Sequence, residues 1–279
     1  MNNTGTLHLK VKDFTGDQAG NCELLIRVST GKLSYAIVNT QEKNLKVLFD
    51  CALFHSSLQE VFLNLPAKYE YLNAGFSKIK VASETFHFTF VPEEIYSQET
   101  LPVLKNFISS SASVRFITNG LDESGIRSIA SVENELVAPV LSKYPQAELF
   151  SQAEPFIKSV LPLTKNTKTL AVQFNSGTFE LLLAIEGRLI YYNIFSAATT
   201  DDFNYFLLMA CRQFDLKSHE TEILLSGEIE KYSENYRRIL KYFNRIAFAD
   251  GSKLFAHPEA FSLVPAHQFF PLLSLGVCG

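Results

Sequence analysis

The sequence contains no tryptophan and only 4 cysteines among its 279 residues. The cysteines are scattered and never take C-x-x-C spacing; they are Cys22, Cys51, Cys211 and Cys278. A zinc knuckle needs clustered ligands, and a disulfide framework is typical of small secreted chains, so neither is expected. We therefore predict reduced thiols and a cytoplasmic protein.

Charged residues are also scarce, at 19% of the chain. The 25 Lys and Arg against 29 Asp and Glu give a net charge of −4, so we expect no basic footprint and no nucleic-acid partner. The first residues lack the basic-then-apolar pattern of a signal peptide. The longest apolar stretch, residues 205–211, is far shorter than the ~20 residues that span a bilayer, so no transmembrane segment is expected.

Apolar residues, in contrast, are abundant. They make up 47% of the chain and include 24 Phe and 11 Tyr, which is ample material for a core. The length is nearly twice the ~150 residues typical of one domain. We therefore expect two domains, residues 1–150 and 151–279.

In the first half, short apolar runs separated by turn residues predict an antiparallel meander with strands at residues 23–28, 33–38 and 45–49. Ser57 and Glu60 have the spacing of a capping box and predict that a helix begins there. Beyond it we predict strands at residues 79–82, 86–91 and 114–118, with the first turn of a helix at 92–94. A longer helix is predicted over 124–141. The proline-containing residues 144–166 are predicted to form the passage between the domains.

In the second half the same order returns. Strands are predicted at residues 169–174, 179–185 and 189–195, followed by a helix capped near Thr200. A further strand at 222–225 precedes a helix whose apolar positions run from Ile229 to Phe243. The sequence FSLVP at residues 261–265 also echoes FTFVP at 88–92.

The two meanders align without a gap. A shift of 146 residues places 23–38 on 169–184, and Gly31 then meets Gly177 in the first turn of each. Any two meanders share some of this pattern, whereas duplication of a βββαβ unit would give two similar α/β domains facing each other across a cleft. The FTFVP echo sits at a different shift, so either the insertions differ between the halves or the echo is accidental.

Three motifs resemble those of the actin-like ATPase superfamily, which includes sugar kinases, Hsp70 chaperones, and cell-division and pilus-assembly members. In the positions of that superfamily's Asp-x-Gly phosphate loops, this chain has RVSTGK at 27–32 and QFNSGT at 173–178. LLSGE at 224–228 is similar to its adenosine motif. The resemblance implies an α/β, actin-like fold of two duplicated RNase H-like domains, each with a mixed sheet that opens in an antiparallel three-stranded meander.

The whole chain is also similar to a narrower group, an uncharacterised bacterial family defined as a conserved domain of unknown function. The shared stretches are LSYAIVN at 33–39, FTFVPEEIY at 88–96 and LLSGEI at 224–229. Members of that family are associated with the actin-like fold and have no established activity. The resemblance therefore implies a fold rather than a reaction.

Both phosphate loops depart from the superfamily's pattern at the residues that serve the metal. Arg27 and Gln173 stand in place of the two aspartates that help to position Mg²⁺, and Ser29 and Asn175 stand in place of glycines. We therefore expect no catalytic residue and no metal ligand. We predict a binding or scaffold protein, that is, a pseudo-ATPase. Its protein partner is unidentified and would be recognised through surface Phe and Tyr. No pattern indicates an oligomeric state.

The loops keep backbone amides and hydroxyls that could hold ATP. The candidate binding residues are Ser29, Thr30, Gly31, Ser176, Gly177, Thr178, Ser226 and Gly227. The alternatives are that both loops are ordinary hairpin turns, or that the protein is an ATP-binding ATPase or phosphotransferase with metal ligands at Asp50, Asp201 or Asp202. No GxxxxGK[ST], GxSxG or HExxH pattern is present to support another chemistry.

Overall fold

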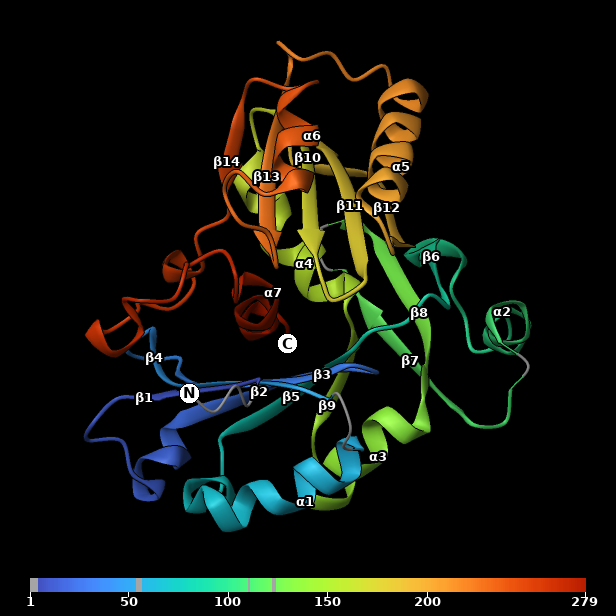
Figure 1. Cartoon of the computed structure of the whole chain (residues 1–279). Coiled ribbons are helices and arrows are strands. Elements are labelled where there is room, and N and C mark those ends of the chain that lie inside the picture. The colour runs from blue at the N-terminus through green and yellow to red at the C-terminus, as the bar shows by residue number, and fades with distance from the viewer. Residues whose placement is uncertain (1–4, 54–56, 110, 122–123) are drawn as a thin grey trace. The chain divides into compact units, whose positions relative to one another are not determined.

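The computed structural model describes residues 5–53, 57–109, 111–121 and 124–279 (Figure 1). Its contacts divide the chain into two compact units. One comprises Met1–Pro155, Ser252–Val264 and Leu272–Gly279, and the other comprises Phe156–Gly251 and Pro265–Pro271. The domain boundary expected at residue 150 stays a prediction; these units differ from it in that two C-terminal segments belong to the first.

The first unit is built on a six-stranded sheet with the order β1-β4-β3-β2-β5-β9. Its strands are β1 (Thr6–Lys10), β2 (Cys22–Ser29), β3 (Lys32–Asn39), β4 (Asn44–Ala52), β5 (Lys78–Ser83) and β9 (Glu148–Ser151). The predicted meander is confirmed as β2, β3 and β4, whose neighbours pair antiparallel, whereas β5 and β9 run parallel to β2.

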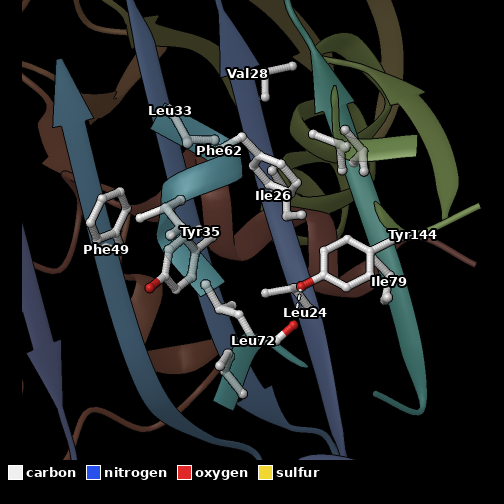
Figure 2. Close-up of a cluster of buried hydrophobic side chains, with 14 of the residues drawn as sticks. Leu24, Ile26, Val28, Leu33, Tyr35, Phe49, Phe62, Leu72, Ile79 and Tyr144 are labelled. Atoms are coloured by element: carbon white, nitrogen blue, oxygen red, sulfur yellow. Dashed lines mark hydrogen bonds between the residues drawn. The ribbon is translucent and has the colours of Figure 1, made fainter. Parts of the chain in front are cut away.

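Helices α1 (Leu58–Lys68) and α3 (Asn134–Lys143) pack on one face of this sheet. The capping box predicted for α1 is confirmed, because Ser57 Oγ accepts the amide of Glu60 and the Glu60 carboxylate accepts the amide of Ser57. Figure 2 shows the core beneath these helices, where Tyr144 donates a hydrogen bond of 2.6 Å to the carbonyl of Leu72. Ile26, Val28 and Leu33 are almost completely buried there.

A three-stranded antiparallel sheet with the order β6-β8-β7 also belongs to the first unit. It consists of β6 (Phe88–Pro92), β7 (Val114–Gly120) and β8 (Ile126–Glu133), with α2 (Leu101–Ile108) between β6 and β7 in sequence. The helix predicted over 124–141 is therefore wrong for its first half, since β8 occupies it. Ile126, Ile129 and Val132 recur every third residue as in a helix, but they are β-branched and lie in a central strand that is buried on both faces.

Two other predictions are corrected. The inter-domain passage expected at 144–166 does contain the boundary between the two units, at Pro155 and Phe156, but it is not an irregular linker. It contains strand β9 and helix α4 (Ala153–Val160), because Ala153, Phe156 and Val160 are buried. The FSLVP echo at 261–265 is accidental: β6 is a strand, whereas the later copy follows a short 3₁₀ turn and its Leu263 is 95% exposed.

The second unit repeats the architecture of the first in a five-stranded sheet with the order β12-β11-β10-β13-β14. Its strands are β10 (Lys168–Phe174), β11 (Thr178–Ile185), β12 (Arg188–Ser196), β13 (Thr221–Gly227) and β14 (Ile246–Phe248). Helices α5 (Thr200–Gln213) and α6 (Glu234–Leu240) pack on one face, and a short α7 (Phe270–Leu273) lies near the C-terminus. The last predicted helix is shorter than the apolar pattern suggested, because it begins at the Ser233 cap.

The duplication extends to the register of the strands. Leu24 pairs with Ile37 in β2–β3, and their counterparts 146 residues later, Leu170 and Leu183, pair in β10–β11. The shift in register between the second and third strands also falls at equivalent places, after Ile37 and after Leu183. Such agreement is not a property of meanders in general and marks the two sheets as copies of one unit.

Candidate functional site

The first candidate loop is the two-residue turn between β2 and β3. Ser29 and Lys32 form the last pair of the hairpin, and Thr30 and Gly31 at its tip are exposed. The carbonyl of Gly31 accepts the amide of Leu53 at 2.8 Å, so one side of the turn is tied to the end of β4. The loop thus presents Thr30 and the tip of the turn to solvent.

A carboxylate lies close to this loop, but cationic and hydroxyl groups already bind it. Asp50 on β4 forms an ion pair with Lys32 at 3.0 Å and accepts a hydrogen bond from Ser34 Oγ at 2.5 Å. Arg27, which stands at the position of the superfamily's first aspartate, lies 4.0 Å from Glu84. The end of this sheet therefore has the Arg27 cation and the ion-paired Asp50 carboxylate, which together make a poor set of ligands for Mg²⁺.

A pocket of about 380 Å³ adjoins Thr30 and lies between the start of α1 and α3. Glu133 and Glu135 line it together with Leu136 and Pro139. Two carboxylates beside a phosphate loop would repel a nucleotide's phosphates rather than attract them. This pocket is therefore a poor phosphate site.

The second candidate loop is organised around a carboxylate that has no counterpart in the first. Glu180 on β11 is completely buried and lies opposite Gln173 on β10. Its Oε1 accepts hydrogen bonds from Gln173 Nε2 at 2.7 Å and from Asn175 Nδ2 at 3.0 Å, and its Oε2 accepts one from Tyr192 OH at 2.7 Å. Three donors thus satisfy both oxygens of a carboxyl group that is buried away from water.

This network fixes the two residues that replace the superfamily's second aspartate and glycine. The Asn175 side chain points back to Glu180, and its Nδ2 also lies 3.4 Å from Thr178 Oγ1. Ser176 and Gly177 form the exposed tip, where Gly177 takes a φ of 77° that only glycine adopts without strain. The turn is therefore a closed hairpin in which the Asn175 side chain is hydrogen-bonded to the buried Glu180.

The third candidate motif, at the end of β13, is joined to the second loop. Ser226 Oγ lies 3.4 Å from Gln173 Oε1, and a Cβ at Gly227 would stand 2.0 Å from the carbonyl oxygen of Phe174. The amide of Gly227 donates to the carbonyl of His267 at 2.9 Å. The glycine is thus required by close packing of the backbone, and its amide already has a partner within the protein.

The remaining acidic candidates have structural partners as well. Asp202 caps α5 by accepting the amide of Thr199 at 2.9 Å, and Asp201 pairs with Arg238 at 2.8 Å. Among the described residues no cluster of three His, Cys, Asp or Glu side chains could hold a metal ion. The eight residues proposed from sequence to bind nucleotide thus fall into two groups: Ser176, Gly177, Thr178, Ser226 and Gly227 lie together in the second unit, and Ser29, Thr30 and Gly31 lie in the first.

Sequence reasoning missed two completely buried acids. Glu180 stands alone in the apolar run FELLLAI, and a single carboxylate in a buried strand was the available signal. Glu154, at the start of α4, is also completely buried and accepts a hydrogen bond from Ser151 Oγ at 2.6 Å. Burial raises the pKa of the Glu154 carboxyl above its ordinary value.

Comparison with known proteins identifies the family. Residues 11–246 match the model of a protein family of unknown function, DUF3822. The chain belongs to the DUF3822 family. A search of the curated proteins finds no match.

The fold of this DUF3822 protein is that of the actin-like ATPases. A protein of unknown function with that fold from Bacteroides thetaiotaomicron VPI-5482 is 19% identical, with a TM-score of 0.78 over 94% of this chain and 98% of the other. The PilM–PilN type IV pilus biogenesis complex contains a chain that is 12% identical, with a TM-score of 0.63 over 91% of this chain and 97% of the other. At these identities the likeness shows the fold alone.

None of the helices in the part of this DUF3822 chain that the structure describes is long and apolar enough to cross a membrane.

Proposed function

We propose that this protein is a non-catalytic, actin-like binding or scaffold protein of the cytoplasm, formed of the domains 1–150 and 151–279. Four observations support its parts: the closed second loop, the ion-paired first loop, a solved complex of the same fold, and the free thiols of Cys22, Cys51 and Cys211. The first of these carries the proposal.

Phosphoryl transfer by an actin-like mechanism needs a carboxylate directed at the metal and a loop whose backbone can approach a phosphate. In this chain the carboxylate near the second loop is Glu180, which is buried and surrounded by donors from Gln173, Asn175 and Tyr192. To bind a metal, Glu180 would have to give up these three hydrogen bonds. The arrangement supports a loop that serves the stability of the fold.

The first loop supports the same function. Lys32 and Ser34 hold Asp50, and Arg27 places a positive charge where the superfamily has an aspartate. The alternative of an ATPase or phosphotransferase would need Asp50, Asp201 or Asp202 to leave its ion pair or helix cap. We propose that Ser29, Thr30, Gly31 and their counterparts in the second unit bind no nucleotide.

A partner protein is the remaining part of the proposal. The PilM–PilN complex is a case in which a chain of this fold assembles with a second protein. In the present chain several large apolar side chains are exposed, among them Phe107 at 85% and Tyr205 at 64%. Exposed aromatic side chains of this kind are common anchors of protein interfaces.

Two assays on the intact protein test this function. Isothermal titration with Mg-ATP into the millimolar range, and phosphate release measured with malachite green, should show neither binding nor turnover. Turnover that is lost in Asp201→Ala and kept in Asp215→Ala would instead establish the enzyme, because Asp215 is highly exposed and lies outside the candidate loops.

A further inference from the structure

The outer edge of strand β12 is a sheet edge that no described strand covers (Figure 1). β12 is nine residues long and pairs on its inner side with β11. An uncovered edge exposes backbone amides and carbonyls, which are a template for another strand.

The other sheet edges carry the features by which proteins block strand addition. β1 has five residues and ends in Lys10, β14 has three residues and β9 has four, while β6 ends in Pro92 and β7 contains Arg115. β12 has no proline, and its only charged residue is Arg188 at its first position. Short strands, prolines and charges block edge pairing, so β12 is the edge that remains receptive.

The internal duplication shows how a strand would sit there. In the first unit β1 adds antiparallel to β4, with Thr6 opposite Cys51 and Lys10 opposite Val47. β4 is the counterpart of β12, displaced by 144 residues, and each carries its register shift at the same place. A strand added to β12 in the same way would lie opposite residues 191–195.

The backbone groups that bind β1 also have counterparts on β12. The amide of Ala52 donates to the carbonyl of Gly5, and the carbonyl of Lys46 accepts the amide of Val11. The residues equivalent to Lys46 and Ala52 are Ile190 and Ser196, and both are exposed. Between them, the amide of Ile194 donates at 2.9 Å to Oδ1 of its own neighbour, Asn193, a local contact that an added strand would replace.

The surroundings of the edge indicate the chemistry of the occupant. Phe195 stacks on Phe206 of α5 at 4.4 Å, and Phe206 contacts the exposed Tyr205. This aromatic group borders the helix-covered side of the edge, so it favours apolar side chains at alternate positions of the added strand.

The charge at the other end favours a carboxylate. An antiparallel strand added to β12 would bring its C-terminal side to the turn between β11 and β12. At this turn the two exposed cations, Arg188 and Lys165, outnumber the one exposed carboxylate, Glu186. The chain's own β1 ends in Lys10 and is followed by Lys12, so exchange of β1 between copies would bring like charges together there.

We propose that β12 accepts, by antiparallel strand addition, an extended segment of a partner protein whose apolar residues alternate and whose C-terminal side carries a carboxylate. This inference rests on the proposed function and names its partner class.

A displayed library of random ten-residue peptides, selected on the intact protein, tests it. Selected peptides should share the alternating pattern and the carboxylate, and should slow hydrogen exchange at the amides of Ile190 and Ile194. Ser196→Pro removes one outward amide and should weaken binding about tenfold, the effect of one hydrogen bond, whereas Ser196→Ala should not. Arg188→Glu should weaken the same peptides, and Arg188→Lys should keep their affinity.

Two results with the library would overturn strand addition: no peptide of this kind is selected, or the selected peptides bind the Ser196→Pro and Ser196→Ala variants with equal affinity. A dimer of the protein that Ser196→Pro dissociates would also overturn it, because the edge would then belong to a second copy. ATP turnover, in contrast, would overturn the proposed function and leave the peptide result standing. The two failures are therefore distinguishable.

Discussion

Tyr192→Phe removes one donor from the buried carboxylate of the second loop. The hydroxyl of Tyr192 lies 2.7 Å from Glu180 Oε2, and the residue is 7% exposed, so water is poorly placed to replace it. Where the carboxyl group is ionised, a hydrogen bond to it contributes about 1.5–3 kcal/mol, because its oxygen is otherwise left without a donor. We expect the free energy of unfolding to fall by that amount.

Urea unfolding followed by circular dichroism measures this loss. With a denaturant slope of about 3 kcal/mol per molar, the midpoint should fall by about 0.5–1 M. Tyr205→Phe is the matched control, since its ring is 64% exposed and its loss of a hydroxyl should change stability by less than about 0.5 kcal/mol.

A double variant separates the charge from the packing. Tyr192→Phe combined with Glu180→Gln should lose less than the sum of the single variants, because a neutral amide needs the phenol less than a carboxylate does. Equal midpoints for Tyr192→Phe and Tyr205→Phe, or strict additivity in the double variant, would contradict an ionised Glu180 at the centre of the loop's hydrogen-bond network.

Three further predictions concern single side chains. Gly227→Ala should destabilise by about 2–4 kcal/mol in urea, because its Cβ would overlap the Phe174 carbonyl, while Gly31→Ala, with open space around it, should change little. Burial raises the pKa of Glu154, so the stability that its protonated form contributes is complete below the ordinary pKa and is lost as pH rises. The free energy of unfolding of Glu154→Gln should therefore exceed that of wild type by most at pH 8. An equal difference at pH 4.5 and pH 8 would contradict this. Burial and nearby lysines lower the pKa of His8, so stability should fall as pH drops below 6.5, and a urea midpoint unchanged between pH 7.5 and 5 would contradict it.

Much of the duplicated fold was predictable because strands and tight turns carry local signals. The alternating and β-branched runs at 23–38 and 169–184, with Gly31 and Gly177 in equivalent turns, fixed both hairpins from residues close together in the chain. The parallel pairing of β5 with β2 and of β13 with β10 depends on contacts distant in sequence, so no local pattern indicated it.

β8 shows where local reasoning fails. In a strand buried on both faces the apolar residues need not alternate, so the spacing of Ile126, Ile129 and Val132 fits a helix equally well. The same limit applied to residues 144–166, where Pro155 and Pro162 suggested a passage although Pro155 lies within the first turn of α4, where a missing amide is tolerated.

The altered loops were visible in the sequence, but the carboxylate that holds the second one was not. Arg27, Gln173 and Asn175 could be recognised as departures from the superfamily's motifs. Glu180 and Tyr192 could not, since Glu180 meets Gln173, and Tyr192 meets Glu180, only through the pairing of neighbouring strands. The nucleotide-binding role that the sequence suggested for the eight loop residues is untested, and the contacts of both loops argue against it.

The central proposal is that this protein of actin-like fold performs no phosphoryl transfer. Its most direct test is calorimetric titration of the intact protein with Mg-ATP at millimolar concentration, coupled to phosphate release from the same sample. The structure predicts no saturable heat and no phosphate above the buffer rate. Saturable binding followed by turnover would contradict it.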